Sequence, residues 1–312
     1  MVIFVLKRIT AAAVLVVVVS FLSFVLTWIT PGDPARSILG VTATPEQIAA
    51  KRAELGLDQN VFAAYASWVG RALTGDLGAS WFSNQPVAES IAARLPVTLS
   101  ITVVAILIAG VIGIGLGLWA AARRGVVDSA IQPFAVLGFA LPNFIVAIML
   151  VTVFALNFRL LPATGWVDFG DDPSGWARSI TLPVIALSVA ATAAVAQQTR
   201  NAAIATLQQD YVRTLRGRGL STRSIFLKHV LRNSAPVALT VLSLQFIGLL
   251  SGAVVIEYMF ALPGIGALTV GAATQQDQPV IQGAVITVVL AVVVVNLLMD
   301  LAYAWLNPKV RS

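Results

Sequence analysis

Residues 97–122 read VTLSITVVAILIAGVIGIGLGLWAAA, a run that holds no charged side chain. As an α-helix this run would be roughly 39 Å long, which exceeds the ~30 Å of hydrocarbon in a bilayer. Backbone groups in lipid must form hydrogen bonds within their own segment, so the run is predicted to be a membrane-spanning helix. Further apolar stretches lie at about 9–29, 131–156, 180–197, 236–256 and 281–305. The sequence therefore predicts an all-α membrane protein with six transmembrane helices, forming a single domain over residues 1–312.

The composition excludes several classes of function. Of the 312 residues, 58% are hydrophobic and 11% are charged, whereas soluble domains carry about 25% charged residues. The chain has no cysteine and one histidine, which excludes disulfides, thiolate metal sites and multi-histidine metal sites. It contains neither a G-x-x-x-x-G-K-[ST] phosphate loop nor a cluster of catalytic residues. We therefore expect no enzyme activity, cofactor or metal in this chain alone.

The basic residues are distributed unevenly among the loops. Segment 200–235 holds seven Lys or Arg and a single acid, whereas loop 31–96 is balanced, with five basic and six acidic residues. Because cytoplasmic loops are enriched in Lys and Arg, this predicts that segment 200–235 and both termini are cytoplasmic, and that 31–96 is external. The protein is expected in the plasma (inner) membrane. The net charge of +6 is then a consequence of topology, and we expect the lipid bilayer, not nucleic acid, as a partner.

Loop 31–96 is long enough to form an external subdomain. Thr44-Pro45-Glu46-Gln47 is typical of a helix start with a capping box, and predicts a helix that runs through Leu55. A second helix is predicted from Val61 to Leu73, and a third from Val87 to Arg94. The subdomain is either a packed lid or a docking surface for an external partner, and the residues favour neither.

Segment 200–235 predicts two short helices at the cytoplasmic side. The first covers Tyr211 to Arg218, and Gly219 ends it in the left-handed conformation that glycine adopts without strain. Ser221 then caps a helix that runs through Leu231. Such a protrusion fits a groove in a cytosolic protein, although a basic loop held against anionic headgroups is the alternative.

Glycine and polar residues within the spans are interpreted from their neighbours in a helix. Glycines in the second span (Gly113, Gly115, Gly117) and the fifth (Gly248, Gly252) are interpreted as close helix-packing faces. The polar residues Asn143, Gln197, Gln245 and Asn296 either join helices or line a pathway. Carboxylates at mid-depth are almost missing, which argues against an ion-coupled transporter and favours a passage driven from outside the chain.

Several motifs resemble those of one transporter family. The string Asp210-Tyr211-Val212-Arg213-Thr214, followed by Arg218-Gly219-Leu220-Ser221, is similar to the coupling-loop motif of ABC importer permeases, in the dipeptide/oligopeptide/nickel branch. Arg213-Thr214-Leu215 stands where the general importer motif has Glu-Ala-Ala. Other matching motifs are Pro31-Gly32-Asp33-Pro34, Arg94-Leu95-Pro96-Val97-Thr98-Leu99, Leu161-Pro162-Ala163-Thr164-Gly165 and Glu257-Tyr258-Met259-Phe260. The long loop 31–96 resembles that of the first of the two permeases in such systems.

The resemblance implies a type I importer permease fold and a set of partners. These are a second homologous permease, two cytosolic subunits that bind ATP and Mg, and an external solute-binding protein that delivers peptides. Nickel chelates, glutathione and haem are the alternative solutes. Contact with the ATPase is then expected at Asp210, Tyr211, Arg213, Thr214, Leu215, Arg216, Gly219, Leu220 and Ser221, and an external gate or receptor contact at Glu257, Phe260, Pro263, Gly264 and Gly266.

Overall fold

The computed structural model describes residues 2–123, 125, 133, 138 and 140–306. Within these residues the fold is almost entirely helical, and the only β pairing is an isolated bridge between Ala79 and Pro86. Five of the described helices are long and apolar enough to cross a membrane, and Asn143–Asn157 forms a shorter apolar helix. The all-α membrane architecture is therefore confirmed. The predicted start of the third span, at Ile131, lies outside the described residues.

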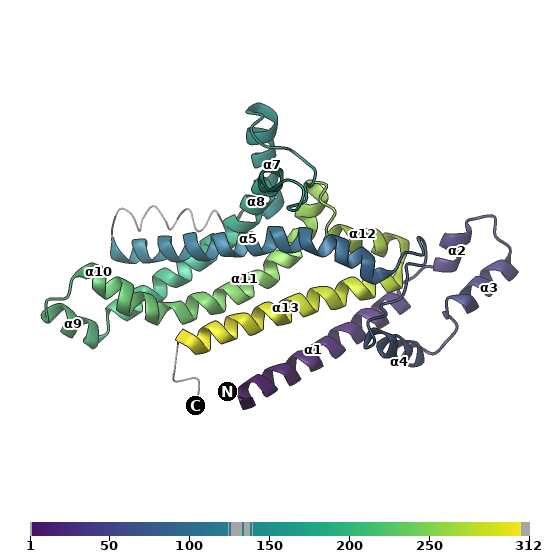
Figure 1. Cartoon of the computed structure of the whole chain (residues 1–312), viewed down its shortest axis with the longest axis horizontal. Coiled ribbons are helices and arrows are strands. Elements are labelled where there is room, and N and C mark those ends of the chain that lie inside the picture. The colour runs from purple at the N-terminus through teal and green to yellow at the C-terminus, as the bar shows by residue number, and fades with distance from the viewer. Residues whose placement is uncertain (1, 124, 126–132, 134–137, 139, 307–312) are drawn as a thin grey trace. The chain divides into compact units, whose positions relative to one another are not determined.

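The helices are labelled in Figure 1. In chain order they are α1 (Val2–Ile29), α2 (Pro34–Leu39), α3 (Pro45–Glu54), α4 (Val61–Ala72), α5 (Val87–Ala122), α7 (Asn143–Leu150) with a π-helical continuation (Val151–Asn157), α8 (Pro173–Leu207), α9 (Asp210–Gly217), α10 (Thr222–Ser224) with a π-helical continuation (Ile225–Val230), α11 (Leu231–Met259), α12 (Ile265–Gln275) and α13 (Gln278–Leu306).

The chain divides into two compact units, and each is described by itself. The bundle unit comprises residues 98–262 and those from 294 onward, and the loop unit comprises residues 2–97 and 263–293. The predicted external subdomain, 31–96, thus belongs to the loop unit, together with α1 and α12.

In the bundle unit, glycines allow α5 to approach α8 closely. A Cβ at Gly113 would lie 2.8 Å from Val195 Cβ, and one at Gly117 would lie 2.5 Å from the Ala196 carbonyl oxygen. These two glycines confirm the predicted packing face, whereas Gly115 faces open space. On α11, Gly252 approaches Asn143 and Leu187, but Gly248 contacts only its own helix.

Helix α8 is the most enclosed of the long helices. In its most apolar window 78% of the residues are buried, against 33% in the segment that contains α11. This explains why the fourth span is Ala-rich, since a helix surrounded by protein needs small residues at its contacts rather than large lipid-facing ones. The span is also much longer than the predicted 180–197, because it begins at Pro173, next to the N-cap Asp172.

In the loop unit, the predicted helix starts are confirmed. The Thr44 hydroxyl accepts from the Gln47 backbone N–H, and the Gln47 side chain accepts from the Thr44 N–H, which completes the capping box. The helix predicted between Val87 and Arg94 is corrected, because it is not a separate element. It forms the first turns of α5 and continues through Pro96, since Val87 and Ile91 pack in one buried cluster with Ile265 and Val280.

An aromatic cluster joins α4 to α1. Phe21 and Phe24 of α1 make ring contacts with Phe62, Tyr65 and Trp68 of α4, at centroid distances between 5.2 and 6.3 Å. The cluster also has a polar contact, because the Tyr65 hydroxyl lies 2.8 Å from Ser20 Oγ. Aromatic pairs of this geometry contribute about 0.5–1.5 kcal/mol each beyond the area that they bury.

A buried carboxylate fixes the loop that precedes α5. Asp277 is 3% exposed, and it accepts hydrogen bonds from the Ser80 hydroxyl and from the Trp81 backbone N–H. Ser80 Oγ in turn accepts from the backbone N–H groups of Phe82 and Ser83. The turn between α12 and α13 therefore holds residues 80–83 in place.

We expect Asp277→Ala to destabilise the loop unit, because it leaves the buried donors of Ser80 and Trp81 without an acceptor. The expected loss is about 2–4 kcal/mol, seen as a lower apparent Tm of the purified chain in detergent. The matched control is Glu54→Ala, which breaks a surface ion pair with Lys51 and should cost less than about 1 kcal/mol. Equal Tm values for the two variants would contradict the role assigned to Asp277.

Candidate functional site

The short helix α9 rests on a buried apolar cluster at one end of the bundle unit. Val212 is fully buried against Ala203 and Leu207 of α8, and the cluster also includes Ala121 of α5. Leu215 packs on the same cluster from the next turn of α9. Val212 and Leu215 are three residues apart, so both lie on one face of the helix. This face packs against the rest of the bundle unit.

The end of α9 is a Schellman motif. The Leu220 N–H donates to the Leu215 carbonyl and the Gly219 N–H to the Arg216 carbonyl, at 3.2 and 2.9 Å. Gly219 has φ +79°, the left-handed conformation that this motif requires. Leu220 and Leu215 both pack against the buried cluster, which supplies the apolar contact that accompanies the motif. The predicted stop at Gly219 is therefore confirmed.

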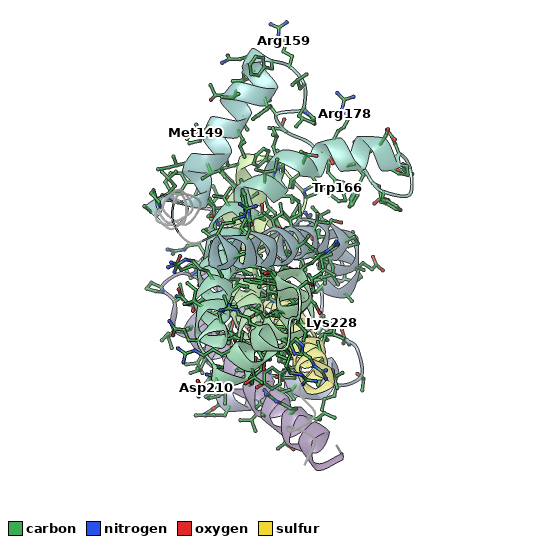
Figure 2. All side chains as sticks on the ribbon, turned by 90° about the vertical axis from the view of Figure 1, so that its left-hand side faces the viewer. Met149, Arg159, Trp166, Arg178, Asp210 and Lys228 are labelled. Carbon is green, nitrogen blue, oxygen red and sulfur yellow. The ribbon has the colours of Figure 1, made fainter. Side chains whose placement is uncertain are left out.

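The opposite face of α9 is exposed and mostly basic. The side chain of Asp210 is 97% exposed and that of Arg213 is 77% exposed, and the two lie 3.8 Å apart. Arg216, Arg218 and Thr214 are exposed as well. Figure 2 views this end of the bundle unit, with Asp210 and Lys228 labelled. Of the predicted coupling residues, Arg213, Thr214 and Arg216 are placed to meet a partner, whereas Leu215 faces the bundle.

Tyr211 links α9 to the start of α11. Asn233 Nδ2 donates to the Tyr211 hydroxyl at 2.9 Å and also to the His229 carbonyl at 2.8 Å. Partial burial raises the pKa of Tyr211, so the phenol stays protonated at neutral pH. The residue is still 41% exposed, and Tyr211 can therefore hold the helix in place and contribute to its outer surface.

The segment after Gly219 differs from the prediction of two short helices. Ser221 caps the next helix as expected, because its hydroxyl accepts from the Ser224 N–H. That helix does not end near Leu231, however, and it is continuous over Thr222–Met259. A π-helical stretch at Ile225–Val230 joins the two parts. The segment predicted to be the coupling segment is thus one short helix, α9, whose capped turn leads directly into the helix that continues as α11.

Glu257 at the other end of α11 is fully buried within the bundle unit. Its carboxylate accepts a hydrogen bond from the Thr98 hydroxyl of α5. The Glu257 carbonyl accepts from the Leu262 N–H at 2.8 Å, which closes the turn after α11. Two motifs that are far apart in sequence, one around Thr98 and one around Glu257, are thereby joined.

The other predicted gate residues are divided between the two units. Phe260 is 2% exposed in the bundle unit, where its carbonyl accepts from the Gly165 N–H at 2.9 Å. Pro263, Gly264 and Gly266 belong to the loop unit, in which Gly264 is the N-cap of α12. The helix α12 was not predicted from the sequence. Whether these residues act as a gate stays a prediction.

The four polar residues suggested as pathway lining are all partly buried in the bundle unit. Gln197 Oε1 is a buried acceptor without a hydrogen-bond partner among the described residues. Asn143 begins α7 and lies beside Gly252 of α11. Gln245 and Asn296 lie on α11 and α13. No contact brings the four together, so their role stays a prediction.

Two models of known protein families match this chain, one over its N-terminal third and the other over the remainder. Residues 113–312 match the family described as binding-protein-dependent transport system inner membrane component, and residues 1–102 match the N-terminal model of such membrane components. The chain belongs to this family. It is a permease of an ABC importer.

Similar proteins support the same assignment. The permease is 39% identical over 308 residues to a Brucella abortus protein named as a peptide transport system permease, with 98% of each chain covered. It is 36% identical to the glutathione transport system permease protein GsiC of Escherichia coli, over 99% of this chain and 98% of that one. Among solved structures, the inward-facing MetNI methionine ABC transporter aligns with 70% of this chain and 96% of that chain, at TM-score 0.54 and 15% identity. This likeness shows the type I importer fold.

Some pairings that shape these sites were not predicted from the sequence. The contacts of Thr98 with Glu257 and of Asp277 with Ser80 are the clearest cases, because each joins residues more than 150 positions apart, which no local pattern reveals. The aromatic cluster between α1 and α4, by contrast, could have been predicted from the sequence. Phe21, Phe24 and Trp28 of the permease recur at helical spacing, as do Tyr65 and Trp68 in the loop that follows.

Gly219→Ala should disorder the turn between α9 and α10. At φ +79° an added Cβ meets no other atom within 4 Å, so the expected cost of about 1–2 kcal/mol is purely conformational. Hydrogen exchange of the 215–221 amides in the purified permease should become faster. The matched control is Gly217→Ala, since Gly217 is helical and equally unobstructed; it should slow exchange or leave it unchanged. The assignment fails if both variants behave alike.

Proposed function

We propose that this permease is the first of two membrane subunits in an ATP-driven importer of peptides. It would pair with a second, homologous permease, receive its solute from an external binding protein and contact two cytosolic ATPase subunits. The supporting observation is its similarity over nearly its whole length to proteins named as peptide transport system permeases. ATP and Mg would be bound by the ATPase subunits, because this chain has no phosphate loop.

In this proposal α9 is the coupling helix. Its buried face, with Val212 and Leu215, packs on α5 and α8, and its exposed face presents Arg213, Thr214 and Arg216. A movement of the ATPase would be passed through this helix to the bundle, and the membrane helices would reorient between inward and outward access. The Schellman turn supports this role because it fixes both the length and the direction of α9.

Peptides are the proposed solutes, and glutathione is the second candidate. Glutathione is favoured by the 36% identity to the GsiC permease over 99% of this chain. Both solutes combine amide groups with free carboxylates. A reconstituted complex that imports di- and tripeptides in an ATP-dependent manner would support the proposal, and import of a non-peptide solute alone would overturn it.

We also propose that both termini and α9 are cytoplasmic and that residues 31–96 are external. The absence of natural cysteine allows a direct test with single introduced cysteines. Ala50→Cys and Thr222→Cys place thiols at exposed positions in α3 and α10. In intact cells an impermeant thiol reagent should label position 50 only, and permeabilisation should expose position 222. The reverse pattern would invert the topology.

Reversing a charge on α9 should uncouple the importer. Arg213→Glu leaves the buried face of α9 unchanged and breaks only an exposed pair with Asp210, so it should not affect folding. In this proposal it reverses a charge on the surface that meets the ATPase, and should reduce substrate-stimulated ATP hydrolysis of the purified complex about tenfold or more.

The control is Lys228→Glu, which makes the same charge change outside α9, at another exposed position of the bundle unit. It should lower ATP hydrolysis much less than Arg213→Glu. If the two variants lose activity equally, and the loss follows the anionic lipid content of the membrane, the segment binds headgroups and α9 is not the coupling helix.

A further inference from the structure

Helix α4 has an exposed apolar stripe in addition to the face that packs on α1. The members of this stripe follow one another at intervals of four, three and four residues, which places them on one side of a helix. Phe62 at its start is 65% exposed, and Leu73 at its end is 84% exposed. On the surface of a water-soluble domain, the exposed side of a helix carries polar residues instead. The outer stripe, as we call it, consists of Phe62, Ala66, Val69 and Leu73.

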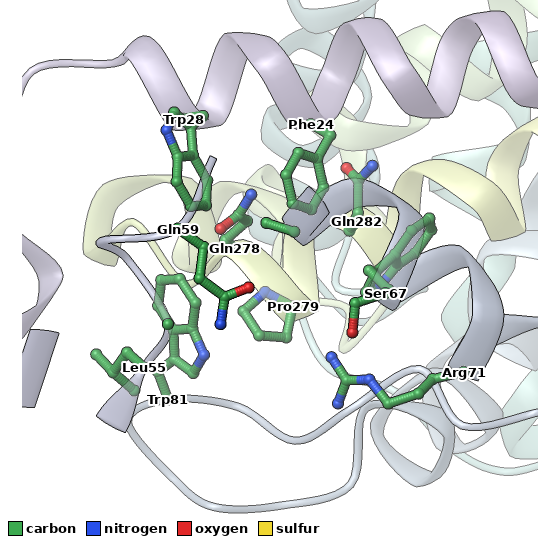
Figure 3. A pocket seen from close by; sticks show the side chains of 13 residues that line it. Phe24, Trp28, Leu55, Gln59, Ser67, Arg71, Trp81, Gln278, Pro279 and Gln282 are labelled. Carbon is green, nitrogen blue, oxygen red and sulfur yellow. The ribbon is translucent and has the colours of Figure 1, made fainter. Parts of the chain in front are cut away.

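The polar residues of α4 lie on another side of the helix. Ser67 and Arg71 are one turn apart, and both line a pocket of about 150 Å³ that Gln59 and Gln278 also line. Figure 3 shows Ser67 and Arg71 at this pocket. Nine residues separate Arg71 from Phe62, which is two and a half turns of helix, so the two point in opposite directions. Ser67 and Arg71 therefore form a polar edge opposite the outer stripe.

The length of α1 fixes its level in the bilayer. Its apolar part, Arg8–Ile29, has 22 residues, and as a helix it is ~33 Å long, close to the ~30 Å of hydrocarbon in a membrane. Lys7 and Arg8 stand at one end of this part, and Thr30-Pro31 follows the other end. A helix that just fills the hydrocarbon has little room to shift, so Ile29 lies near one surface of the membrane.

The ring contacts of α4 are with residues inside this span. Phe62 stacks on Phe21 at a centroid distance of 5.9 Å, and Trp68 lies 6.3 Å from Phe24. Phe24 and Phe21 precede Ile29 by five and eight residues, so they lie ~8 and ~12 Å below that surface. This depth is close to the ~5–10 Å at which the apolar faces of interfacial helices are buried. The contacts therefore place α4 at the level of the acyl chains.

A hydrogen bond reaches still deeper along α1. The Tyr65 hydroxyl donates to the Val17 carbonyl at 3.2 Å and lies 2.8 Å from Ser20 Oγ. Val17 precedes Ile29 by twelve residues, which corresponds to ~18 Å of helix. The side chain of a tyrosine is much shorter than this distance. A helix that lay in the water above the membrane could not make this contact.

Helix α3 of the same loop has the opposite character. Four of its ten residues are charged, and none of the ten is buried. In α4, by contrast, Arg71 is the single charged residue among twelve. The composition of α3 suits water, whereas that of α4 suits the boundary between headgroups and acyl chains. The charged residues of α3 are Glu46, Lys51, Arg52 and Glu54.

The outer stripe borders a surface of α1 that itself requires lipid. Phe62 stacks on Phe21, and on α1 the neighbours Val18 and Leu22 are both exposed. In the most apolar window of α1 only 11% of the residues are buried. Large aliphatic side chains exposed within a membrane span are in contact with acyl chains. The same acyl chains are therefore the neighbours that the adjoining outer stripe fits.

We propose that α4 is an interfacial helix embedded in the leaflet at the Ile29 end of α1, with its outer stripe in contact with lipid acyl chains. In the proposed topology this is the outer leaflet. The polar edge, with Ser67 and Arg71, faces the headgroups and water. The partner of this surface is the bilayer, and α4 anchors the external subdomain to it. The proposal requires that α1 spans the membrane, and it does not depend on the imported solute.

The test places spin labels at two neighbouring positions of α4. Because the chain has no cysteine, Ala66→Cys and Ser67→Cys each carry one label, the first on the outer stripe and the second on the polar edge. Both positions are exposed. Leu22→Cys on α1 is the lipid-facing control, and Ala50→Cys on α3 is the water-facing control. For each full-length variant in lipid nanodiscs, power saturation measures collisions of the label with oxygen, which concentrates among acyl chains, and with a nickel chelate, which stays in water.

At Ala66 we expect the ratio of oxygen to nickel collisions to be several-fold higher than at Ala50 and similar to that at Leu22. At Ser67 we expect a ratio several-fold lower than at Ala66. The two residues are adjacent in the sequence, so such a difference comes from the side of α4 on which the label lies and not from the label or the loop as a whole.

Three outcomes would overturn the proposal. A ratio at Ala66 equal to that at Ala50 would place α4 in water. Few collisions with either reagent at Ala66 would mean that protein, such as a second copy of the chain, covers the outer stripe. Equally high ratios at Ala66 and Ser67 would mean that α4 is surrounded by lipid and has no polar edge. Collision ratios are measured without transport, so a failure to import peptides would change none of these readings.

Discussion

The close approach of α5 and α8 at Gly113 and Gly117 is the constraint on which the bundle unit depends. Two helices in lipid gain little from excluding water, so their association rests on van der Waals contact and on small residues at the contact. At both glycines a side chain would collide with the backbone or Cβ atoms of α8. The Ala-rich sequence of α8 follows from the same geometry, because α8 is enclosed by its neighbours. Its modest hydropathy therefore reflects a central position.

The same pair of helices determines what α9 can do. The cluster beneath α9 contains Ala121 from α5, Ala203 and Leu207 from α8, and Val230 just before α11. A force on α9 would thus act on three long helices through one packed contact, without a flexible connection between them. The Schellman turn at Gly219 and the cap at Ser221 also fix the chain that follows the C-terminal end of α9. A short helix fixed at both ends moves as a body with the helices that carry it.

Features that depend on neighbouring residues could be predicted from the sequence, whereas features that depend on distant contacts could not. Capping residues such as Thr44 and Ser221, and the stop at Gly219, depend on a few neighbouring residues, and the structure agrees with them. The start at Val87 was right, but the predicted end at Arg94 was wrong, because α5 continues through Pro96 while its first turns are buried with Ile265 and Val280. The partners of Glu257 and Asp277 depend on contacts distant in sequence, and no local pattern predicted the π-helical stretches. Sequence motifs predicted a coupling segment, a role that stays a prediction, but only the packing shows that Leu215 faces inward.

The buried polar groups of this permease differ in whether they have hydrogen-bond partners. Glu257 and Asp277 are fully or almost fully buried carboxylates, and each accepts from a hydroxyl of a distant segment. A buried charge without such a partner would cost several kcal/mol, so pairing is what allows these acids to remain in the fold. The buried side-chain atoms without a hydrogen bond among the described residues are instead all neutral, and belong to tryptophan, glutamine and threonine. An unpaired neutral donor or acceptor costs about 1–3 kcal/mol, which is less than an unpaired buried charge. This difference explains why both buried acids of this permease have hydrogen-bond partners in distant segments, whereas some buried neutral atoms in the described part of the chain have none.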